Sequence, residues 1–322
     1  MSQERATVVC ITPVKNEEWI IERFLSAASL WADVIIVADQ ESTDRTAEIC
    51  RSFPKVRLVR NDSGRFNEED RQRLLINEAR KIPGKRLLVA LDADEFLTGN
   101  FNYNSEWNEI LMAEPGTAFE IKWPCIAEDF SRYWMTEGAS NLFAVMDNGC
   151  QHRGREIHST RVPVDEQTVV RRLDQLEVMH FQYTDWERMK RKNLWYQCYE
   201  RIHYPEKSIA SIYRMYHHMD VSKSMQKIPE SWFDAYLAAG INLKQKRSQT
   251  VEYWWTKEIN GFVNQYGDDY FKYIDLPWNH NAMLRYLRST QSLWKYRYGR
   301  AFLRRVDPVF ERCLRKGNQN KA

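Results

Sequence analysis

Short apolar runs recur through the first hundred residues, separated by stretches with helical spacing. Each run is apolar at nearly every position and rich in β-branched residues, which favour strands. A strand without polar alternation is buried on both faces, as in a parallel sheet covered by helices. The predicted strands are residues 7–12, 33–38, 56–59 and 86–91, and the predicted helices are 17–31, 47–53 with Ser42 and Thr43 at its N-cap, and 65–80. The sequence therefore predicts an α/β fold with a mostly parallel sheet.

The composition of the chain changes after about residue 105. Short β-like runs continue at residues 119–123, 141–146 and 177–181, mixed with tryptophans and charged residues. Beyond Thr184 the apolar residues follow helical spacing. We therefore expect two domains, an α/β domain over residues 1–184 and a mainly helical region over residues 185–322.

Cysteine usage and the apolar segments indicate where the protein resides. The six cysteines form no CxxC pair and show no regular spacing, which favours reduced, cytosolic thiols. The N-terminus lacks the apolar core of a signal peptide, and no stretch approaches the roughly 20 apolar residues of a membrane span. The net charge of +3 is too small to indicate a nucleic-acid partner. We expect a cytoplasmic protein.

The fourth apolar run ends in a cluster of carboxylates, in the sequence LLVALDADEFL at residues 87–97. Asp92, Asp94 and Glu95 repel one another at this spacing, so the cluster needs a cation, a hydrogen-bonding partner or a pKa shift. An Asp-x-Asp pair suits Mg²⁺ or Mn²⁺, which would neutralise the repulsion. The alternative is structural: Asp92 or Asp94 caps the following segment or pairs with a lysine or an arginine.

Polar groups follow three of the four predicted strands. Residues 13–18 come after the first strand, Asp39 after the second, and Asp92 and Asp94 after the fourth. In a parallel sheet these ends meet at one rim, where ligands of such folds bind. We therefore expect a single site built from segments far apart in sequence.

Three segments of the sequence resemble family 2 glycosyltransferases, which have the Rossmann-like GT-A fold. They are TPVKNEEWIIERFL, VIIVADQESTDRTAEI and LLVALDADEFL, all within the first hundred residues. The resemblance implies a metal-dependent transferase using Mn²⁺ or Mg²⁺ and a UDP- or GDP-linked sugar. The acceptor would be a hydroxyl group of a saccharide or a lipid-linked saccharide, and transfer would proceed with inversion.

The resemblance also assigns residues to the donor and the metal. In the family the segment after the first strand borders the nucleoside, an acid after the second binds the base, and the Asp-x-Asp pair holds the ribose and the metal. By position these roles fall to Pro13, Val14 and Glu17 for the nucleoside, Asp39 for the base, Asp92 for the ribose and Asp94 for the metal. The loop after Asp39 departs from the family pattern Asp-Asp-Gly-Ser, because residues 40 and 41 are Gln and Glu.

An inverting transferase needs a general base, and metal-dependent members of this fold often add a histidine ligand. The candidates for the catalytic base are Glu156 with its neighbour His158, preferred over Asp129, which stands in a Glu-Asp pair; Asp165 is a further acid in this region. For the metal, His180 is the best match and His158 the second.

The C-terminal segment is basic and amphipathic. Residues 285–322 contain eleven Lys or Arg against Asp307 and Glu311. Apolar residues recur every four positions in this segment, at Tyr298, Phe302, Val306 and Phe310. The pattern fits either contact with an anionic membrane at the inner face or a last helix packed on its own domain. Pro308 is expected to kink a helix there.

Three other classes of protein fit the sequence less well. A haloacid dehalogenase-type phosphatase also carries Asp-x-Asp, but here Phe96 stands where that class has Thr or Val. A sugar nucleotidyltransferase normally has a Gly-rich loop after the first strand, and TPVKNEE has no glycine. A carbohydrate-binding protein would use the many aromatic residues but leaves the strand-end carboxylates without a purpose.

Overall fold

The computed structural model describes residues 5–135, 140–220, 223–245 and 253–319. The chain divides into two compact units. The first comprises Met1–Thr184 and Met225–Gln249, and the second Asp185–Ser224 and Thr250–Ala322. The division at Thr184 falls where the sequence suggested a boundary, but residues 225–249 return to the first unit.

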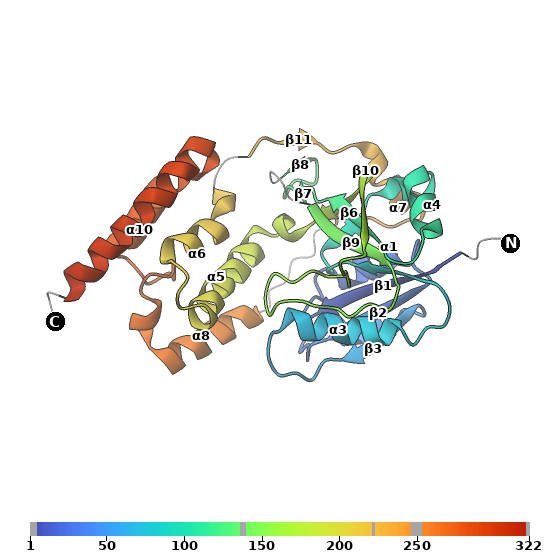
Figure 1. Cartoon of the computed structure of the whole chain (residues 1–322), viewed down its shortest axis with the longest axis horizontal. Helices are drawn as coiled ribbons and strands as arrows, with labels where there is room; N and C mark the ends of the chain where they lie inside the picture. The colour runs from blue at the N-terminus through green and yellow to red at the C-terminus, as the bar shows by residue number, and fades with distance from the viewer. Residues whose placement is uncertain (1–4, 136–139, 221–222, 246–252, 320–322) are drawn as a thin grey trace. The chain divides into compact units, whose positions relative to one another are not determined.

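The first four long strands form one parallel half of the sheet of the first unit (Figure 1). Their spatial order is β4-β1-β2-β3. They are β1 (Thr7–Val14), β2 (Val34–Asp39), β3 (Val56–Arg60) and β4 (Arg86–Ala90). All four strands lie within one or two residues of the predicted runs, because burial on both faces leaves a continuous apolar signal.

The other half of the sheet is mixed. β9 (Ser140–Met146) lies antiparallel between β4 and β6 (Thr117–Lys122), and β10 (Val169–His180) runs parallel to β6. Four short strands extend the sheet: β5 (Glu95–Leu97), β7 (Cys125–Ile126), β8 (Arg132–Trp134) and β11 (Gln226–Lys227). The predicted fold class, a mostly parallel sheet flanked by helices with a helical C-terminal region, is confirmed. The antiparallel insertion of β9 was not predicted.

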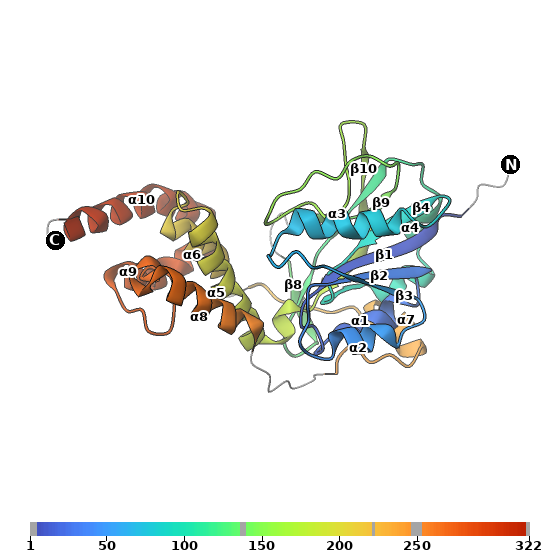
Figure 2. The same cartoon turned by 90° about the horizontal axis from the view of Figure 1, so that it is seen from below.

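Helices cover both faces of the parallel half (Figure 2). α1 (Ile21–Ala28) and α2 (Thr46–Arg51) lie on one face and α3 (Glu68–Ala79) on the other. Alternate residues of β1 therefore enter different cores: Val8 packs with Phe24 of α1, whereas Val9 packs with Leu75 of α3. α4 (Ser105–Met112) joins the same core as α1.

Residues 225–245 are attached to the first unit by polar contacts, most of them buried. The hydroxyl group of Tyr236, in α7 (Asp234–Ala238), donates a hydrogen bond to the carbonyl oxygen of Leu97. The buried guanidinium of Arg23 donates to the carbonyl oxygens of Leu243, at 3.0 Å, and Gln245, at 2.6 Å. These contacts satisfy groups that would otherwise be buried without a partner.

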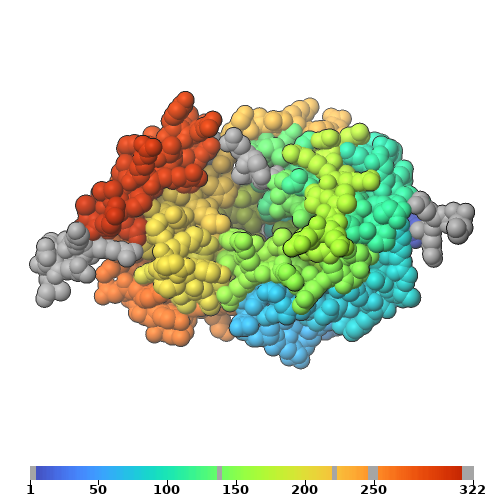
Figure 3. Space-filling view, viewed as in Figure 1, coloured from blue at the N-terminus to red at the C-terminus, as the bar shows by residue number. Residues whose placement is uncertain are grey.

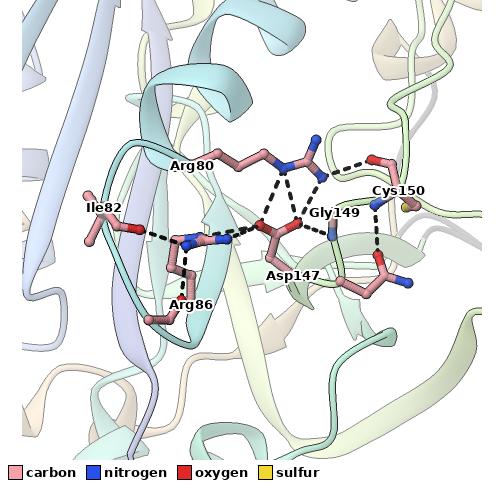
Figure 4. Close-up of polar contacts among 8 residues, drawn as sticks. Arg80, Ile82, Arg86, Asp147, Gly149 and Cys150 are labelled. Atoms are coloured by element: carbon pink, nitrogen blue, oxygen red, sulfur yellow. Dashed lines mark hydrogen bonds and ion pairs between the residues drawn. The ribbon is translucent and has the colours of Figure 1, made fainter.

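An ion-pair cluster around Asp147 ties the edges of α3, β4 and β9 together (Figure 4). The Asp147 side chain is fully buried and accepts hydrogen bonds from Arg80 at 2.8 Å and Arg86 at 3.0 Å. It also accepts the backbone N–H of Gly149 at 3.1 Å. Burial favours the neutral acid, but these donors outweigh it and lower the pKa of Asp147.

We expect Asp147→Asn to destabilise the first unit by roughly 3 kcal/mol at neutral pH, because two arginines lose a buried partner. The folded-state pKa lies below the unfolded value of about 3.9, so the ion pairs stabilise the protein above that pH. Their contribution disappears as the pH falls through the folded-state pKa. Urea unfolding at several pH values should therefore show the difference between variant and wild type shrinking in acid.

The matched control for this prediction is Asp62→Asn, since Asp62 is 63% exposed in its pair with Arg60. That change should cost less than about 1 kcal/mol at any pH. An Asp147→Asn variant as stable as the control at neutral pH would contradict the assignment.

The second unit is helical. Its helices are α5 (Trp186–His203), α6 (Ile209–Tyr216), α8 (Trp254–Tyr266), α9 (Ala282–Thr290) and α10 (Arg297–Gln319). Short 3₁₀ segments complete the two units: η1 (Gly99–Asn102), η2 (Gln182–Thr184), η3 (His218–Asp220), η4 (Glu230–Trp232), η5 (Asp268–Phe271) and η6 (Gln291–Lys295). Within the part of the chain that the structure describes, none of the helices has the length and apolar character of a membrane span.

A buried arginine joins three helices of the second unit. Arg214 of α6 is 1% exposed and pairs with Asp307 of α10 at 3.2 Å. Its guanidinium also donates to the carbonyl oxygen of Leu287, at 3.0 Å, and to the side chain of Gln291, at 2.9 Å. α10 continues as one helix through Pro308, the residue at which the sequence predicts a kink.

Candidate active site

The carboxyl ends of β1, β2 and β4 meet at one rim of the sheet. Val14 at the end of β1 is in register with Asp39 at the end of β2. Ile11 of β1 is in register with Ala90, and its carbonyl oxygen accepts the backbone N–H of Leu91 at 3.2 Å. The segments after these strands therefore converge, as the strand order in the sequence suggested.

Two loops at this rim are held together by hydrogen bonds across about 27 residues of chain. Asn16, which has a left-handed φ of 55°, donates its backbone N–H to Ser42 Oγ at 2.9 Å. Its side-chain oxygen accepts the N–H of Thr43 at 2.7 Å. The predicted N-cap at Ser42 and Thr43 is wrong, because α2 begins at Thr46 and both residues bind the loop after β1 instead.

The donor residues expected from the family resemblance border this pair of loops. Val14 is buried, whereas Pro13 and Asp39 are half-buried. The backbone N–H of Glu17 donates to Thr46 Oγ1 at 2.8 Å, and one of its carboxylate oxygens accepts the indole N–H of Trp19 at 2.7 Å. α1 begins at Ile21 and is preceded by a turn, in which the Glu17 carbonyl oxygen accepts the N–H groups of Ile20 at 2.9 Å and Ile21 at 2.8 Å.

The acidic cluster after β4 receives a cation from a distant segment. The guanidinium of Arg161 donates one hydrogen bond to Glu95 Oε2 and another to Asp92 Oδ2, the second with a nitrogen–oxygen distance of 2.9 Å. Glu95 is completely buried and also accepts the backbone N–H of Asp92 at 2.9 Å. Burial raises the pKa of Glu95, and the Arg161 guanidinium opposes that shift. An arginine thus offsets the repulsion between these two carboxylates.

The third carboxylate faces a histidine. β5 pairs with the end of β10, and the Phe181 N–H donates to the Asp94 carbonyl oxygen at 2.7 Å. This pairing places His180 Nε2 3.7 Å from Asp94 Oδ2, and both side chains are buried. Burial lowers the pKa of His180, but the neighbouring carboxylates of Asp94 and Glu95 outweigh it and raise the pKa to about 9.

Trp123 contacts both cationic side chains. Its ring stacks on His180 with centroids 4.2 Å apart and an angle of 10° between the planes. The Arg161 guanidinium lies over the same tryptophan, 5.5 Å from its centroid. Such contacts favour positive charge on both partners. Arg161 and His180 are therefore held in fixed positions beside the acidic cluster.

The loop that carries Arg161 follows α3 to the rim. It starts near Cys150, whose carbonyl oxygen accepts a hydrogen bond from Arg80 at the end of α3. At the other end of the helix Glu68 donates its N–H to the Glu156 carbonyl oxygen and accepts the N–H of Ser159, both at 2.9 Å. The next turns of the loop bring Arg161 to the carboxylates.

The candidate bases lie on two different segments. Glu156 is half-buried in the loop beside α3, and His158 is exposed with a left-handed φ of 58°. Asp129 is exposed, and its carboxylate accepts the N–H groups of Ser131 and Arg132. These hydrogen bonds lower the pKa of Asp129 to about 2, so this carboxylate is a weak base fixed in a turn.

Asp94 and His180 fit a divalent cation in kind and in spacing. A carboxylate oxygen and a neutral imidazole nitrogen are both ligands of Mn²⁺, so an ion bound here would displace the proton that the neighbouring carboxylates favour on His180. Their 3.7 Å separation lies below about 4.2 Å, twice a metal–ligand distance of roughly 2.1 Å, so one ion could contact both. No three or more His, Cys, Asp or Glu side chains among the described residues are arranged to hold a metal. Any ion here would need further ligands from a bound molecule.

Arg161, Glu95 and Trp123 were not singled out for the site from the sequence. Glu95 was recognised only as part of the acidic cluster, and Trp123 only as a residue in a β-like run. The pair between Arg161 and Asp92 spans 69 residues. An apolar strand that ends in three acids implies a compensating cation, but no local sequence pattern identifies which arginine supplies the positive charge.

Comparisons with known proteins place the resemblance in the same part of the chain. Residues 9–101 match the model of Glycosyl transferase family 2, which confirms the resemblance over these residues. No curated protein matches the chain.

Similar solved structures cover only part of the chain. One is glucosyl-3-phosphoglycerate synthase from Mycobacterium tuberculosis, at 23% identity over 38% of this chain and 44% of that one, with a TM-score of 0.28. Another is 4-diphosphocytidyl-2C-methyl-D-erythritol synthase, at 16% identity over 29% of this chain and 48% of that one, with a TM-score of 0.23. A third, described as a mycobacterial protein, has 20% identity over 38% and 41% with a TM-score of 0.28. The chain spans less than half the length of each.

We expect Arg161→Ala to destabilise the first unit by about 3–5 kcal/mol, because it leaves the buried Glu95 carboxylate without its cation. Urea unfolding followed by circular dichroism measures this loss. Arg132→Ala is the matched control, since the pair of Arg132 with Asp129 is exposed and should contribute less than about 1 kcal/mol. Equal stability of the two variants would show that Arg161 does not compensate the cluster.

Proposed function

We propose that this chain is a metal-dependent glycosyltransferase that moves a sugar from a UDP- or GDP-linked donor to a hydroxyl group of a saccharide or lipid-linked saccharide. The observation that carries this proposal is the Asp94–His180 pair at the rim of the sheet, 3.7 Å apart and buried. The family match over residues 9–101 supports the same class. Direct displacement with inversion follows the habit of that family.

The nucleoside would lie over the loops after β1 and β2. Pro13, Val14 and Glu17 border this position, and the Asp39 carboxylate would accept hydrogen bonds from the base. Because Asn16 bonds to both Ser42 and Thr43, the two loops form one preorganised edge. Preorganisation lowers the cost of ordering the protein when the donor binds.

The ribose and the diphosphate would reach the carboxylates after β4. Arg161 holds Asp92 Oδ2, which fixes the orientation of that carboxylate for the ribose hydroxyl groups. Asp94 and His180 would hold Mn²⁺ or Mg²⁺. When bound there, the ion would supply positive charge for the diphosphate that leaves. With only these two protein ligands, metal binding should depend on the nucleotide.

Glu156 is the better candidate for the base that takes the proton from the acceptor. The low pKa of Asp129 makes it a poor proton acceptor, and its carboxylate already serves the turn at Ser131 and Arg132. Glu156 stands five residues before Arg161 in the loop that reaches the rim. His158 is the neighbour that could hold or relay the proton.

Mn²⁺ together with UDP or GDP should raise the melting temperature of the wild-type protein, whereas either alone should have a smaller effect. Asp94→Asn should abolish the joint shift and lower donor hydrolysis or transfer by on the order of 100-fold or more. Thermal shift and turnover over a panel of nucleotide sugars measure both quantities. Asp62→Asn, which removes an exposed carboxylate, is the control and should behave like wild type.

Full turnover of the Asp94→Asn variant in added manganese would remove the metal role from this residue. A wild-type protein that binds saccharides but shows no shift with any nucleoside diphosphate would instead favour a carbohydrate-binding protein. Formation of a nucleotide sugar from a sugar phosphate would favour a nucleotidyltransferase.

Glu156→Gln should lower turnover by roughly 100-fold or more at unchanged donor binding, since general-base catalysis contributes about 10²–10⁴-fold. Asp129→Asn should change turnover only slightly. Steady-state kinetics with the nucleotide sugar that the panel identifies as the donor gives both turnover numbers. Thermal shifts with nucleoside diphosphates check that the donor site is intact. The opposite ranking of the two variants would move the base to Asp129.

A further inference from the structure

α10 in the second unit has an inner face that packs on its neighbours. Leu303 is fully buried, and Phe310 stacks on Tyr286 of α9 with ring centroids 4.1 Å apart. Val306 and Phe310 are half-buried. The apolar stripe expected from the sequence is therefore split, since its Val306 and Phe310 turn toward the unit's own core.

Both acidic residues of α10 also face inward. Asp307 is 5% exposed and accepts hydrogen bonds from Arg214 and from the Tyr286 hydroxyl group, the latter at 2.8 Å. Glu311 is 8% exposed, and its carboxylate accepts the N–H of Ile209 at 3.4 Å. The sequence of α10 contains no other acid. The negative charge of the helix is therefore turned away from solvent.

The outer face of α10 combines exposed apolar side chains with arginines. Tyr298, Phe302 and Val309 are 89%, 55% and 50% exposed and follow one another at spacings of four and seven, so they share one side of the helix. Two exposed arginines, Arg305 and Arg312, lie on the same side of the helix as this strip, and Arg297 and Arg304 are exposed on its flank. Figure 3 shows α10 as a band on the surface of its unit.

We propose that this outer face of α10 binds the surface of a membrane that contains anionic lipids. The apolar strip would enter the boundary between headgroups and acyl chains, and the arginines would contact lipid phosphates. The charge is complementary, because Arg305 and Arg312 lie beside the strip, Arg297 and Arg304 are exposed on the flank, and both acids of the helix are buried. Each cation near such a surface contributes to binding, and the effect is screened by salt.

Other occupants fit these side chains less well. A nucleic acid would match the arginines but leave the exposed strip of Tyr298, Phe302 and Val309 in water. A second copy of the chain packed on this face would bring two sets of arginines together, which is unfavourable. A bilayer surface accommodates both the cations and the apolar strip. This proposal is independent of the activity proposed above.

Flotation of the full-length chain with lipid vesicles tests the proposal. The protein should bind vesicles that contain about one third phosphatidylglycerol and should not bind pure phosphatidylcholine. Arg305→Gln with Arg312→Gln should weaken binding about 30-fold, at roughly a tenfold change per 1.4 kcal/mol. Phe302→Ser should weaken it about tenfold. Circular dichroism confirms that each variant is folded.

Two control variants make the same kinds of substitution in the first unit, away from α10. Arg171→Gln with Arg172→Gln removes two exposed cations from β10 of the first unit, so the net charge changes equally. Leu237→Ser replaces a side chain that is 59% exposed, close to the 55% of Phe302. Both controls should bind the anionic vesicles like wild type.

Three results would overturn the proposal. One is a wild-type protein that stays unbound in the presence of the anionic vesicles. Another is equal weakening in the α10 variants and in their controls, which would indicate a general charge effect. The third is that the wild-type protein forms a dimer in gel filtration, or binds a DNA duplex tightly, and that Phe302→Ser abolishes this association while vesicle binding is unchanged.

Discussion

The three carboxylates that follow β4 lie within four residues, and two cations from distant segments lie against them. Arg161 contacts Asp92 and Glu95, and His180 faces Asp94. Without these cations the buried end of the strand would carry uncompensated negative charge, which is costly inside a protein. β10 and the loop beside α3 deliver the two side chains.

Within the cluster Glu95 has a structural role, whereas Asp94 and the neighbouring His180 are placed to bind an ion. Glu95 is fully buried and bonded to Arg161 and to the Asp92 backbone, so it fixes the turn after β4. His180 Nε2 lies 3.7 Å from Asp94 Oδ2, so the two side chains are close enough to share an ion. Trp123 connects the two parts by stacking on His180 beneath the Arg161 guanidinium. The site is rigid because each cation has more than one contact.

The parallel strands could be predicted from the sequence because burial on both faces leaves runs without polar residues. Helix starts were harder to predict: residues 17–20 have helical spacing, yet α1 begins at Ile21 and these residues form a turn before it. The convergence of Asp39 and Asp94 at one rim follows from strand direction alone. Arg161 could not be found, because its contacts join segments 66 to 69 residues apart and leave no local pattern. The return of residues 225–249 depends on similar long-range contacts.

The most direct test of the account is a crystal structure of the protein with UDP or GDP and MnCl₂, with anomalous diffraction recorded at the manganese edge. The account predicts an anomalous peak within coordination distance of the Asp94 carboxylate and His180 Nε2, adjoining the diphosphate. A bound nucleotide with no peak there, or a peak held by other residues, would contradict it.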